Sequence, residues 1–480
     1  MGSRPRNISM RVEDVLACAS GSIVAPAGCG KTHLITKVLS VRPHKPILVL
    51  THTTAGVAAL KRRLRQLSIP ASHYVVTTID GWALRIANNF PRSCPIYSSP
   101  DNPHKFYTEM RLSVLRFLAN GGIHEVIKAS YSRLLVDEYQ DCDINQHSLV
   151  VSLSEMIPTV IFGDPMQCIF NFAGPMPDWN NDVLQRFPLI GSLNIPWRWN
   201  NAGAPLLGQW ILEVREILLH GGNVDLRTCP AYVRWHQLTG ISQTDLINQH
   251  NAQYSILNNH PNDSLLIIGC SMNEQSRHNY AQGSLRTEVV EPVQLASVTG
   301  AASQFDNATG LALATAILQV ANTMMTNVEV AQTSKRIESI LNGRNKKPPT
   351  TSEHALCNTV IDSTRSNILV ALQHLELKPG TRVYRRSAYN ALKDSISLAI
   401  TSPVKSMFDT ASIVRERLRQ HGDKRIPHRA IGSTLLLKGL EADHCLILDA
   451  NARGMNAKHL YVALSRGAKT VTVFSRHHYW

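Results

Sequence analysis

The residues best suited to chemistry stand in a short loop near the start of the chain. The loop reads A-P-A-G-C-G-K-T and matches the pattern G-x-x-x-x-G-K-[ST], with alanine in the first position. In such a loop, glycines let backbone N–H groups surround phosphate oxygens, a lysine such as Lys31 reaches the β- and γ-phosphates, and a hydroxyl such as that of Thr32 ligates Mg²⁺. A strand-like segment precedes the loop and a helix-like segment follows it, as a phosphate-binding loop requires. The predicted nucleotide-binding residues here are Ala25, Gly28, Cys29, Gly30, Lys31 and Thr32.

Two adjacent acids end a strand-like run later in the chain. The apolar residues 134–136 predict a buried strand of a parallel sheet, which would bring Asp137 and Glu138 to the carboxyl edge of that sheet. Phosphoryl transfer to water needs one carboxylate to hold Mg²⁺ and a second to orient or deprotonate the water. We assign the first task to Asp137 and the second to Glu138. A surface turn that happens to carry acids is the alternative, and the presence of the phosphate-binding loop disfavours it.

A third strand-like run, TVIFGD, leads into the segment PMQCIFNF. Gln167 in this segment has a neutral amide that can hydrogen-bond a γ-phosphate. Taken alone, a glutamine at such a place is more often an ordinary loop residue.

Composition narrows the class of protein. The formal net charge of +14 is typical of a protein that binds a polyphosphate such as nucleic acid, although a merely basic surface gives the same charge. No apolar run approaches the ~20 residues of a membrane helix, and the N-terminal segment lacks the apolar stretch of a signal peptide. The nine cysteines include no C-x-x-C pair, so neither a disulfide framework nor a zinc or iron–sulfur site is indicated. We therefore expect a cytoplasmic protein with no membrane partner.

A set of ordered segments adds a family resemblance. The chain contains, in this order, APAGCGKT, ILVLTHTTAGVAALKRRL, VVTTIDGWALRIA, LLVDEYQDCDINQ, VIFGDPMQCIF, LNIPWRW, STLLLKGLEADHCLILDA and HLYVALSRGAK. These segments resemble the successive motifs of the superfamily 1A helicases, the UvrD/PcrA/Rep group. The combination of D-E-x-Q-D, G-D-x-x-Q and K-G-L-E is the most diagnostic part. The resemblance implies ATP hydrolysis with Mg²⁺ and movement along single-stranded DNA, 3′ to 5′.

The resemblance also implies roles around the nucleotide. Gln167 resembles the sensor of the γ-phosphate, and Trp197 stands where an aromatic ring stacks on adenine. Arg198 and Arg466 resemble two arginine fingers, one from each motor domain, which would neutralise charge in the transition state. Glu441 resembles the acid that contacts the ribose.

Candidate DNA contacts lie where two further strand-like runs end. The first run, ILVLT, and the second, YVVTT, would reach the sheet edge where this family touches the DNA backbone, and an aromatic ring at 172 would offer a surface for base stacking. Each of these residues could equally be a packed residue of the sheet edge. The basic run 61–65 could face phosphates or simply be a solvated helix face. The predicted DNA-binding residues are Thr51, His52, Thr53, Thr78, Asp80 and Phe172.

The predicted fold is α/β, with two RecA-like parallel-sheet motor domains and the ATP between them. Motor domain 1 is predicted over 1–200, with a small insertion at about 88–130. Motor domain 2 is predicted over 201–289 and 428–480, and the residues between them, 290–427, read as a mainly helical accessory insertion.

Several positions depart from the family pattern. The segment before the phosphate-binding loop, NISMRVEDVLACASG, lacks the glutamine that usually recognises adenine, so a strict preference for ATP is not predicted. Leu437 stands before K-G-L-E where a histidine is common, and Ala173 replaces an arginine.

Three functions are compatible with these features to different degrees. The favoured one is a translocase or helicase that acts on single-stranded DNA or a DNA junction. The second is an ATPase sensor or regulatory subunit with a nuclease or other protein partner, because short UvrD-like proteins resemble the helicase partners in antiphage systems such as Gabija. A P-loop kinase or GTPase is disfavoured by Arg466 and its surrounding motif and by the absence of N-K-x-D.

Overall fold

The computed structural model describes residues 10–99, 102–170, 174–284, 286–291, 296–402, 404–421 and 427–480. Their contacts divide the chain into two compact units. The first unit comprises Met1–Arg234, Met455–Val471 and His478–Trp480, and the second comprises Trp235–Gly454 and Thr472–His477. In the part of the chain described, no helix has the length and apolar character to cross a bilayer.

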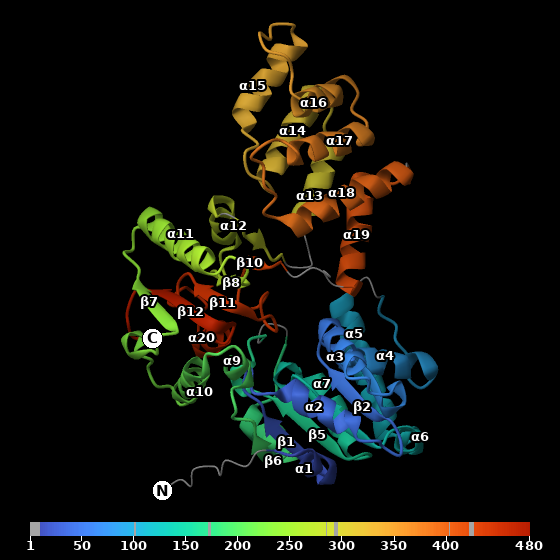
Figure 1. The fold of residues 1–480 in the computed structure, drawn as a ribbon. Helices are drawn as coiled ribbons and strands as arrows, with labels where there is room; N and C mark the ends of the chain where they lie inside the picture. The colour runs from blue at the N-terminus through green and yellow to red at the C-terminus, as the bar shows by residue number, and fades with distance from the viewer. Residues whose placement is uncertain are drawn as a thin grey trace. The chain divides into compact units, whose positions relative to one another are not determined.

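The first unit is built on a six-stranded sheet with the order β3-β2-β4-β5-β1-β6 (Figure 1). All neighbouring strands are parallel. The order places β5 between β1, which leads into the phosphate-binding loop, and β4, which leads into the two acids. The strands are β1 Ser20–Val24, β2 Ile47–Thr51, β3 Tyr74–Thr78, β4 Arg133–Val136, β5 Thr159–Gly163 and β6 Leu189–Ser192.

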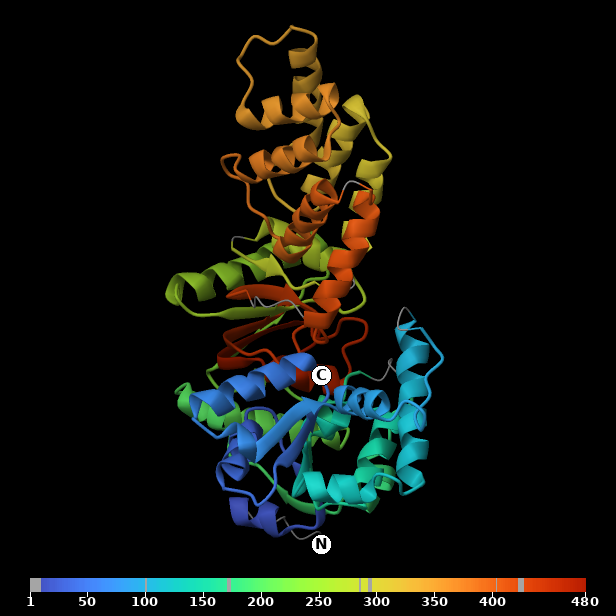
Figure 2. The ribbon, with the colours of Figure 1, turned by 90° about the vertical axis from the view of Figure 1, so that its right-hand side faces the viewer.

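Helices cover both faces of this sheet (Figures 1 and 2). Successive side chains of a strand point to opposite faces, so Leu135 packs with α2 and α3, whereas Leu134 and Val136 pack with α4, α5 and α7. This explains why the central strands are continuous apolar runs. The helices of the first unit as a whole are α1 Val12–Ala17, α2 Lys31–Ser40, α3 Thr54–Gln66, α4 Ile79–Asn89, α5 Pro103–Ala119, α6 His124–Ser130, α7 Ile144–Ser154, α8 Leu184–Arg186, α9 Trp197–Asn201, α10 Pro205–Leu219 and α20 Ala457–Leu464.

Short helical turns complete the first unit. They are η1 Ala71–His73, η2 Tyr139–Asp141, η3 Pro165–Gln167, the π-helical turn η4 Trp179–Val183 and η5 Leu226–Thr228. The turns η2 and η3 directly follow β4 and β5, so both lie at the carboxyl edge of the sheet.

The region predicted as a small insertion, about 88–130, contains α5 and α6. Helix α5 begins at Pro103 because Asn102 caps it and the proline occupies its first turn. Its end is followed by Gly121, whose φ of +76° is a conformation that favours glycine.

The second sheet has the order β7-β12-β11-β8-β10-β9. The pairings of β10 with β8 and β9, and of β11 with β8, are parallel. Helices α11 Ser242–Asn259 and α12 Glu274–Gly283 contribute to its core. The strands are β7 Val233–Gln237, β8 Leu265–Ile268, β9 Glu288–Val289, β10 Arg429–Gly432, β11 Ala442–Ile447 and β12 Gly467–Ser475. The predicted α/β fold with two parallel sheets is therefore confirmed.

A helical bundle lies between β9 and β10 in the sequence, within the predicted insertion 290–427 (Figure 2). Its core draws its buried residues from positions 298–414 alone, so the bundle has a core of its own. The helices are α13 Ala296–Asp306, α14 Gly310–Asn322, α15 Val330–Leu341, α16 Thr351–Ile361, α17 Arg365–Glu376, α18 Arg386–Thr401 and α19 Met407–His421.

Three stretches group differently from the predicted division. Residues 201–234, 455–471 and 478–480 were predicted for motor domain 2 and lie in the first unit. The physical reason is α10, which packs against α9 and α20 within that unit.

Candidate active site

The phosphate-binding loop spans the six residues between β1 and α2. Gly28 and Gly30 have φ values of +70° and +90°, a region that other residues rarely adopt. Space is restricted as well, because a Cβ on Gly28 would lie 2.8 Å from the ring of Trp199, and one on Gly30 would lie 3.0 Å from Trp197. Gly30 is the N-cap of α2, so the first N–H groups of the helix face the end of the loop. The loop is therefore shaped to surround an anion with backbone donors.

Lys31, the first residue of α2, contacts both predicted acids. Its Nζ lies 2.9 Å from Asp137 Oδ1, and it also forms an ion pair with Glu138. Burial alone would lower the pKa of the lysine, but the two carboxylates outweigh burial and raise it above its usual range, so the ammonium stays charged. Burial raises the pKa of Asp137, and Lys31 opposes that rise.

The donor set at this point suits Mg²⁺. The hydroxyl of Thr32 and the carboxylate of Asp137 are hard oxygen donors, which is the ligand type that Mg²⁺ takes in proteins. Asp137 is held in place because its backbone N–H donates to the Leu50 carbonyl oxygen at 2.8 Å.

A chain of amides and carboxylates extends from Glu138 to Gln167. The Nε2 of Gln140 donates to Glu138 Oε2 at 2.6 Å, and its Oε1 accepts from the backbone N–H of Asp164 at 3.1 Å. The Nε2 of Gln167 donates to Asp164 Oδ2 at 3.1 Å. Glu138 itself has a φ of +56° and a ψ of +40°, an uncommon conformation for a residue other than glycine. The predicted water-orienting acid and the predicted γ-phosphate sensor are thus linked through Gln140 and Asp164.

Sequence reasoning assigned no role to four residues that hold this arrangement. Arg215 of α10 forms a buried ion pair with Asp164, with Nη2 to Oδ1 at 2.7 Å. The Tyr461 hydroxyl of α20 accepts from the backbone N–H of Ala27 in the loop at 2.9 Å. Gln140 belongs to D-E-x-Q-D and Asp164 to G-D-x-x-Q, so these motifs could have indicated their roles. No motif surrounds Arg215.

Both predicted arginine fingers bond to the C-terminal end of α20. Arg198 Nη1 donates to the Ser465 carbonyl oxygen at 2.6 Å. Arg466 is buried, with Nε donating to the Val462 carbonyl oxygen at 2.8 Å and Nη2 to Ser465 Oγ at 2.7 Å. Helix α20 also packs on η3, which carries Gln167. The structure therefore brings both arginines to the same unit as the loop, and their action on a phosphate stays a prediction.

A pocket of about 370 Å³ opens beside the loop. Trp197, Cys29 and His33 line it together with the segment 10–13, which belongs to the region where no adenine-reading glutamine was found. Trp197 is 48% exposed, and an exposed aromatic residue that lines a pocket suits stacking on a base. Glu441, the predicted ribose contact, belongs to the second unit and is exposed just before β11, so its role also stays a prediction.

The two groups of predicted DNA contacts meet at one edge of the first sheet. Thr51 ends β2 directly opposite Thr78, which ends β3. The hydroxyls of Thr53 and Thr78 cap the helices that follow, accepting backbone N–H groups at 3.0 and 2.9 Å. The ring of His52 stacks near Phe170, and its buried Nδ1 has no partner among the described residues. Thr51 is buried, and Phe172 lies outside the described residues.

Asp80 has structural partners. Its two carboxylate oxygens accept from Arg111 of α5 at 2.6 and 2.7 Å, and Gln146 of α7 donates to it at 3.1 Å. Arg111 also pairs with Asp143 at 2.5 Å. These bonds tie the small insertion to α4 and α7, so Asp80 has little capacity left to accept from another ligand.

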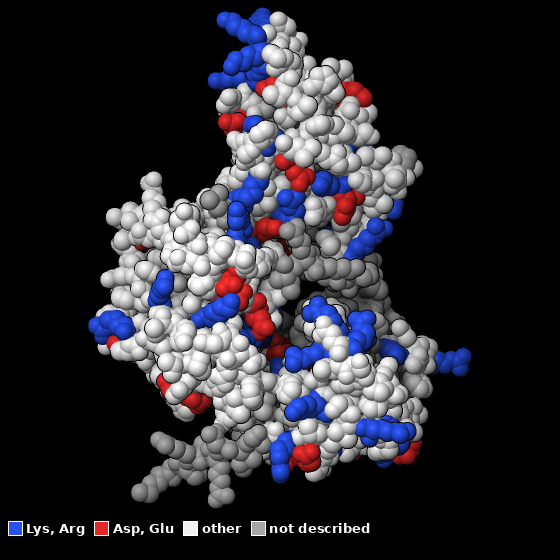
Figure 3. Space-filling model, viewed as in Figure 1, with Lys and Arg blue, Asp and Glu red and all other residues white. Residues whose placement is uncertain are grey.

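Helix α3 supplies the basic surface next to this edge. Lys61, Arg62, Arg63 and Arg65 are all exposed on it. Figure 3 shows Lys and Arg side chains gathered over α3. Such a surface attracts a phosphate backbone regardless of its sequence.

Comparisons with known proteins agree with the motifs. A family model described as an AAA domain matches residues 11–173. The Gabija protein GajB of Bacillus cereus (strain VD045) is 29% identical over 91 residues, which cover 18% of this chain and 18% of GajB. A solved complex of the arterivirus nonstructural protein 10 helicase with DNA aligns with 57% of this chain and 53% of its own at 10% identity, but its TM-score of 0.28 is too low to support a conclusion. In its motifs and in these matches the chain is similar to superfamily 1 helicases.

Proposed function

We propose that this protein hydrolyses ATP with Mg²⁺ in order to move along single-stranded DNA or at a DNA junction, 3′ to 5′, as superfamily 1A enzymes of the UvrD/Rep type do. The observation that carries the proposal is the contact of Lys31 with both Asp137 and Glu138 at the end of the phosphate-binding loop. A lysine, a metal-binding acid and a water-orienting acid at one sheet edge are the parts that ATP hydrolysis needs.

Each residue of this edge has one task in the proposal. Thr32 and Asp137 would hold Mg²⁺, which neutralises charge on the phosphates when it is bound. Glu138 orients the attacking water and accepts its proton, while Gln140 fixes one of its carboxylate oxygens. Gln167 hydrogen-bonds the γ-phosphate. Asp164 bonds to both Gln167 and Gln140, and Gln140 in turn bonds to Glu138. A movement of Gln167 on loss of the γ-phosphate therefore changes the contacts of Glu138 as well.

The remaining predicted residues complete the nucleotide and DNA contacts. Trp197 stacks on the base in the neighbouring pocket, and Glu441 contacts the ribose. Arg198 and Arg466 act on the γ-phosphate, which requires Arg466 to leave its bonds to α20. The edge formed by Thr51 and its neighbours receives the DNA backbone.

A second function is favoured by the similarity to GajB over 91 residues. In that case the ATPase would be a sensor or regulatory subunit of a nuclease-containing antiphage complex, with little unwinding of its own. The two functions differ in what controls hydrolysis, since a motor responds to DNA and a regulatory subunit responds to its partner.

Steady-state ATP hydrolysis with and without single-stranded DNA separates these functions. The test uses the full chain, the variant Glu138→Gln and the control Glu125→Gln, because Glu125 is 86% exposed on α6 and pairs only with Lys128 at i,i+3 among the contacts described. The motor function is supported if single-stranded DNA stimulates ATP hydrolysis, Glu138→Gln abolishes this hydrolysis and Glu125→Gln retains it. A rate of ATP hydrolysis that does not change when DNA is added contradicts the motor function. Stimulation by a purified nuclease partner would then favour the regulatory subunit.

A further inference from the structure

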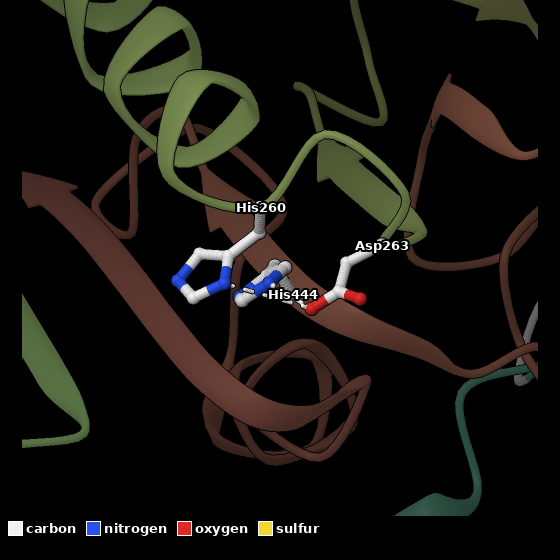
Figure 4. A group of neighbouring side chains, drawn as sticks. All are labelled: His260, Asp263 and His444. Carbon is white, nitrogen blue, oxygen red and sulfur yellow. Dashed lines mark hydrogen bonds and ion pairs between the residues drawn. The ribbon is translucent and has the colours of Figure 1, made fainter.

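Three side chains with metal-binding atoms meet at the amino-terminal edge of the second sheet. His260 is the C-cap residue directly after α11, Asp263 lies just before β8, and His444 is the third residue of β11. The strands β8 and β11 are parallel neighbours, with His444 paired to Leu265, so their starting ends lie side by side. Figure 4 shows the two imidazole rings next to each other and the carboxylate of Asp263 facing them.

The distances suit a small ion between these residues. Asp263 Oδ2 lies 3.1 Å from His444 Nε2 and 3.8 Å from His260 Nδ1, and the three ligand atoms all lie within 4.8 Å of one another. Bonds of ~2.1 Å in a tetrahedral site place ligand atoms about 3.4 Å apart. The distances of 3.1 and 3.8 Å bracket this value, so an ion can enter with only small side-chain movements.

The backbone around these ligands is already fixed. Asp443 Oδ2 accepts from both the N–H and the hydroxyl of Ser264, at 2.9 and 2.6 Å. The backbone N–H of His444 donates to the Ser264 carbonyl oxygen at 3.1 Å. These bonds join the loop before β8 to the start of β11. Two of the ligands are therefore held together by the sheet itself, which reduces the ordering cost of binding.

Burial is graded across the group. The His444 side chain is 1% exposed, Asp263 is 22% exposed and His260 is 48% exposed. The group is thus closed on the sheet side and open to solvent at His260. An ion has a path of entry, and a fourth position remains open to water.

We propose that His260, Asp263 and His444 form a site for a divalent transition metal ion, with Zn²⁺ the best match. Two imidazoles and one carboxylate are a ligand set that Zn²⁺ takes with water in the fourth position. Mg²⁺ and Ca²⁺ are poor candidates because they prefer oxygen ligands and more of them. The site is independent of the proposed ATPase, and it would link the end of α11 to the start of β11.

A second group in the same unit is less suitable. Glu274 and Glu291 approach His278 at 3.5 and 3.6 Å. Glu291 is already engaged by the buried Arg385, whose Nη2 donates to its second oxygen at 3.0 Å. A cation there would have to displace or repel that guanidinium. His278 therefore provides a rival site that the experiment must exclude.

The test is calorimetric titration of the full-length, untagged protein with Zn²⁺ after chelator treatment. The visible absorption of bound Co²⁺ is a second readout, since it is strong only in four- or five-coordinate sites. The variants are His260→Ala, which is exposed, and Asp263→Asn. The controls are His428→Ala, an exposed histidine at the same edge whose Nε2 is within 3.0 Å of the Asn262 carbonyl oxygen, and His278→Ala in the rival group.

We expect one equivalent of tightly bound Zn²⁺ in the parent protein and in both controls. Both variants should bind Zn²⁺ more than about 100-fold more weakly than the parent. Loss of a residue that only hydrogen-bonds to a metal ligand typically lowers metal affinity about 10–100-fold, and these variants remove a ligand itself. Circular dichroism spectra that match the parent exclude misfolding as the cause. The proposal is overturned if the parent binds no Zn²⁺ tightly, if both variants bind as the parent does, or if His278→Ala or His428→Ala removes the binding.

Discussion

Gln140 is the residue whose replacement tests the proposed active site most sharply. Its amide bridges Glu138 and the backbone of Asp164, donating to one and accepting from the other. Gln140 itself is 5% exposed, so water replaces these bonds only poorly. The variant Gln140→Ala removes both bonds without touching the phosphate-binding loop or Lys31.

The expected size of the effect follows from the two bonds. The bond to the Glu138 carboxylate involves a charged acceptor at 2.6 Å and contributes about 1.5–3 kcal/mol, and the neutral bond at 3.1 Å contributes about 0.5–1.5 kcal/mol. Together they give about 2–4.5 kcal/mol. If this energy serves to hold Glu138 against the attacking water, kcat falls roughly 30- to 2000-fold. The KM for ATP should change little, because the contacts of the bound nucleotide remain.

Gln140→Glu separates the two bonds. It keeps an oxygen that can accept from Asp164, but it replaces the donor to Glu138 with a like charge at about the same 2.6 Å. Like charges at such a distance disfavour ionisation of one of the pair. We expect this variant to be at least as slow as Gln140→Ala, with a pH profile of kcat shifted to higher pH.

The assay is steady-state ATP hydrolysis over a range of ATP concentrations, with saturating single-stranded DNA. Gln253→Ala is the matched control, because Gln253 is an equally buried amide of the second unit that bonds to Thr287 and Tyr280. The control should lose stability and keep its kcat. If Gln140→Ala retains kcat within threefold of the parent, the orientation of Glu138 does not depend on Gln140.

Three further predictions concern burial and charge. Arg215→Met should destabilise the first unit by about 3–5 kcal/mol in denaturant unfolding, since it leaves Asp164 as an unpaired buried charge, and adding Asp164→Asn should recover part of that loss. Burial, reinforced by Arg385, lowers the pKa of His278 to about 4, so between about pH 6.5 and 4 the unfolded chain binds a proton that the folded chain does not. The free energy of unfolding should therefore fall with falling pH in this window, by at most about 3 kcal/mol. His278→Asn should flatten this part of the stability profile, and an unchanged profile would contradict the assignment of the effect to His278. Burial, with the charge of Asp164, raises the pKa of Cys29 to about 12, so mass spectrometry should find Cys29 unmodified after maleimide treatment of the native protein at neutral pH, and rapid labelling would show an open loop.

The parts of the site that could be predicted are those in which sequence order and spatial order coincide. Lys31 follows its loop within one motif, and Asp137 and Glu138 follow a buried apolar strand. In a parallel sheet all such strand ends meet at one edge, so the contact of the lysine with both acids follows from the pattern. The α/β fold was predictable for the same reason, because apolar runs followed by helical patterns specify this layer arrangement.

The parts that escaped prediction depend on contacts between distant segments. Arg215 meets Asp164 only because α10 packs under the site, and nothing in its local sequence distinguishes it from a surface arginine. Asp80 was predicted to bind DNA because it follows a strand end, and its bond to Arg111 of the small insertion was not foreseen. Its contact with DNA stays a prediction. The pair of His260 and His444 could not be predicted either, since they are 184 positions apart in the sequence and only the sheet brings them together.

The strand order relates the nucleotide contacts to the candidate DNA contacts. Strand β2 has β4 on one side and β3 on the other, so Thr51 lies between the acids and Thr78. The N–H of Asp137 donates to the Leu50 carbonyl oxygen, one residue before Thr51. A displacement of Asp137 on metal binding would strain this bond unless the end of β2 followed. If the proposed hydrolysis displaces Asp137, this bond would pass the displacement to the end of β2 and so to the proposed DNA surface.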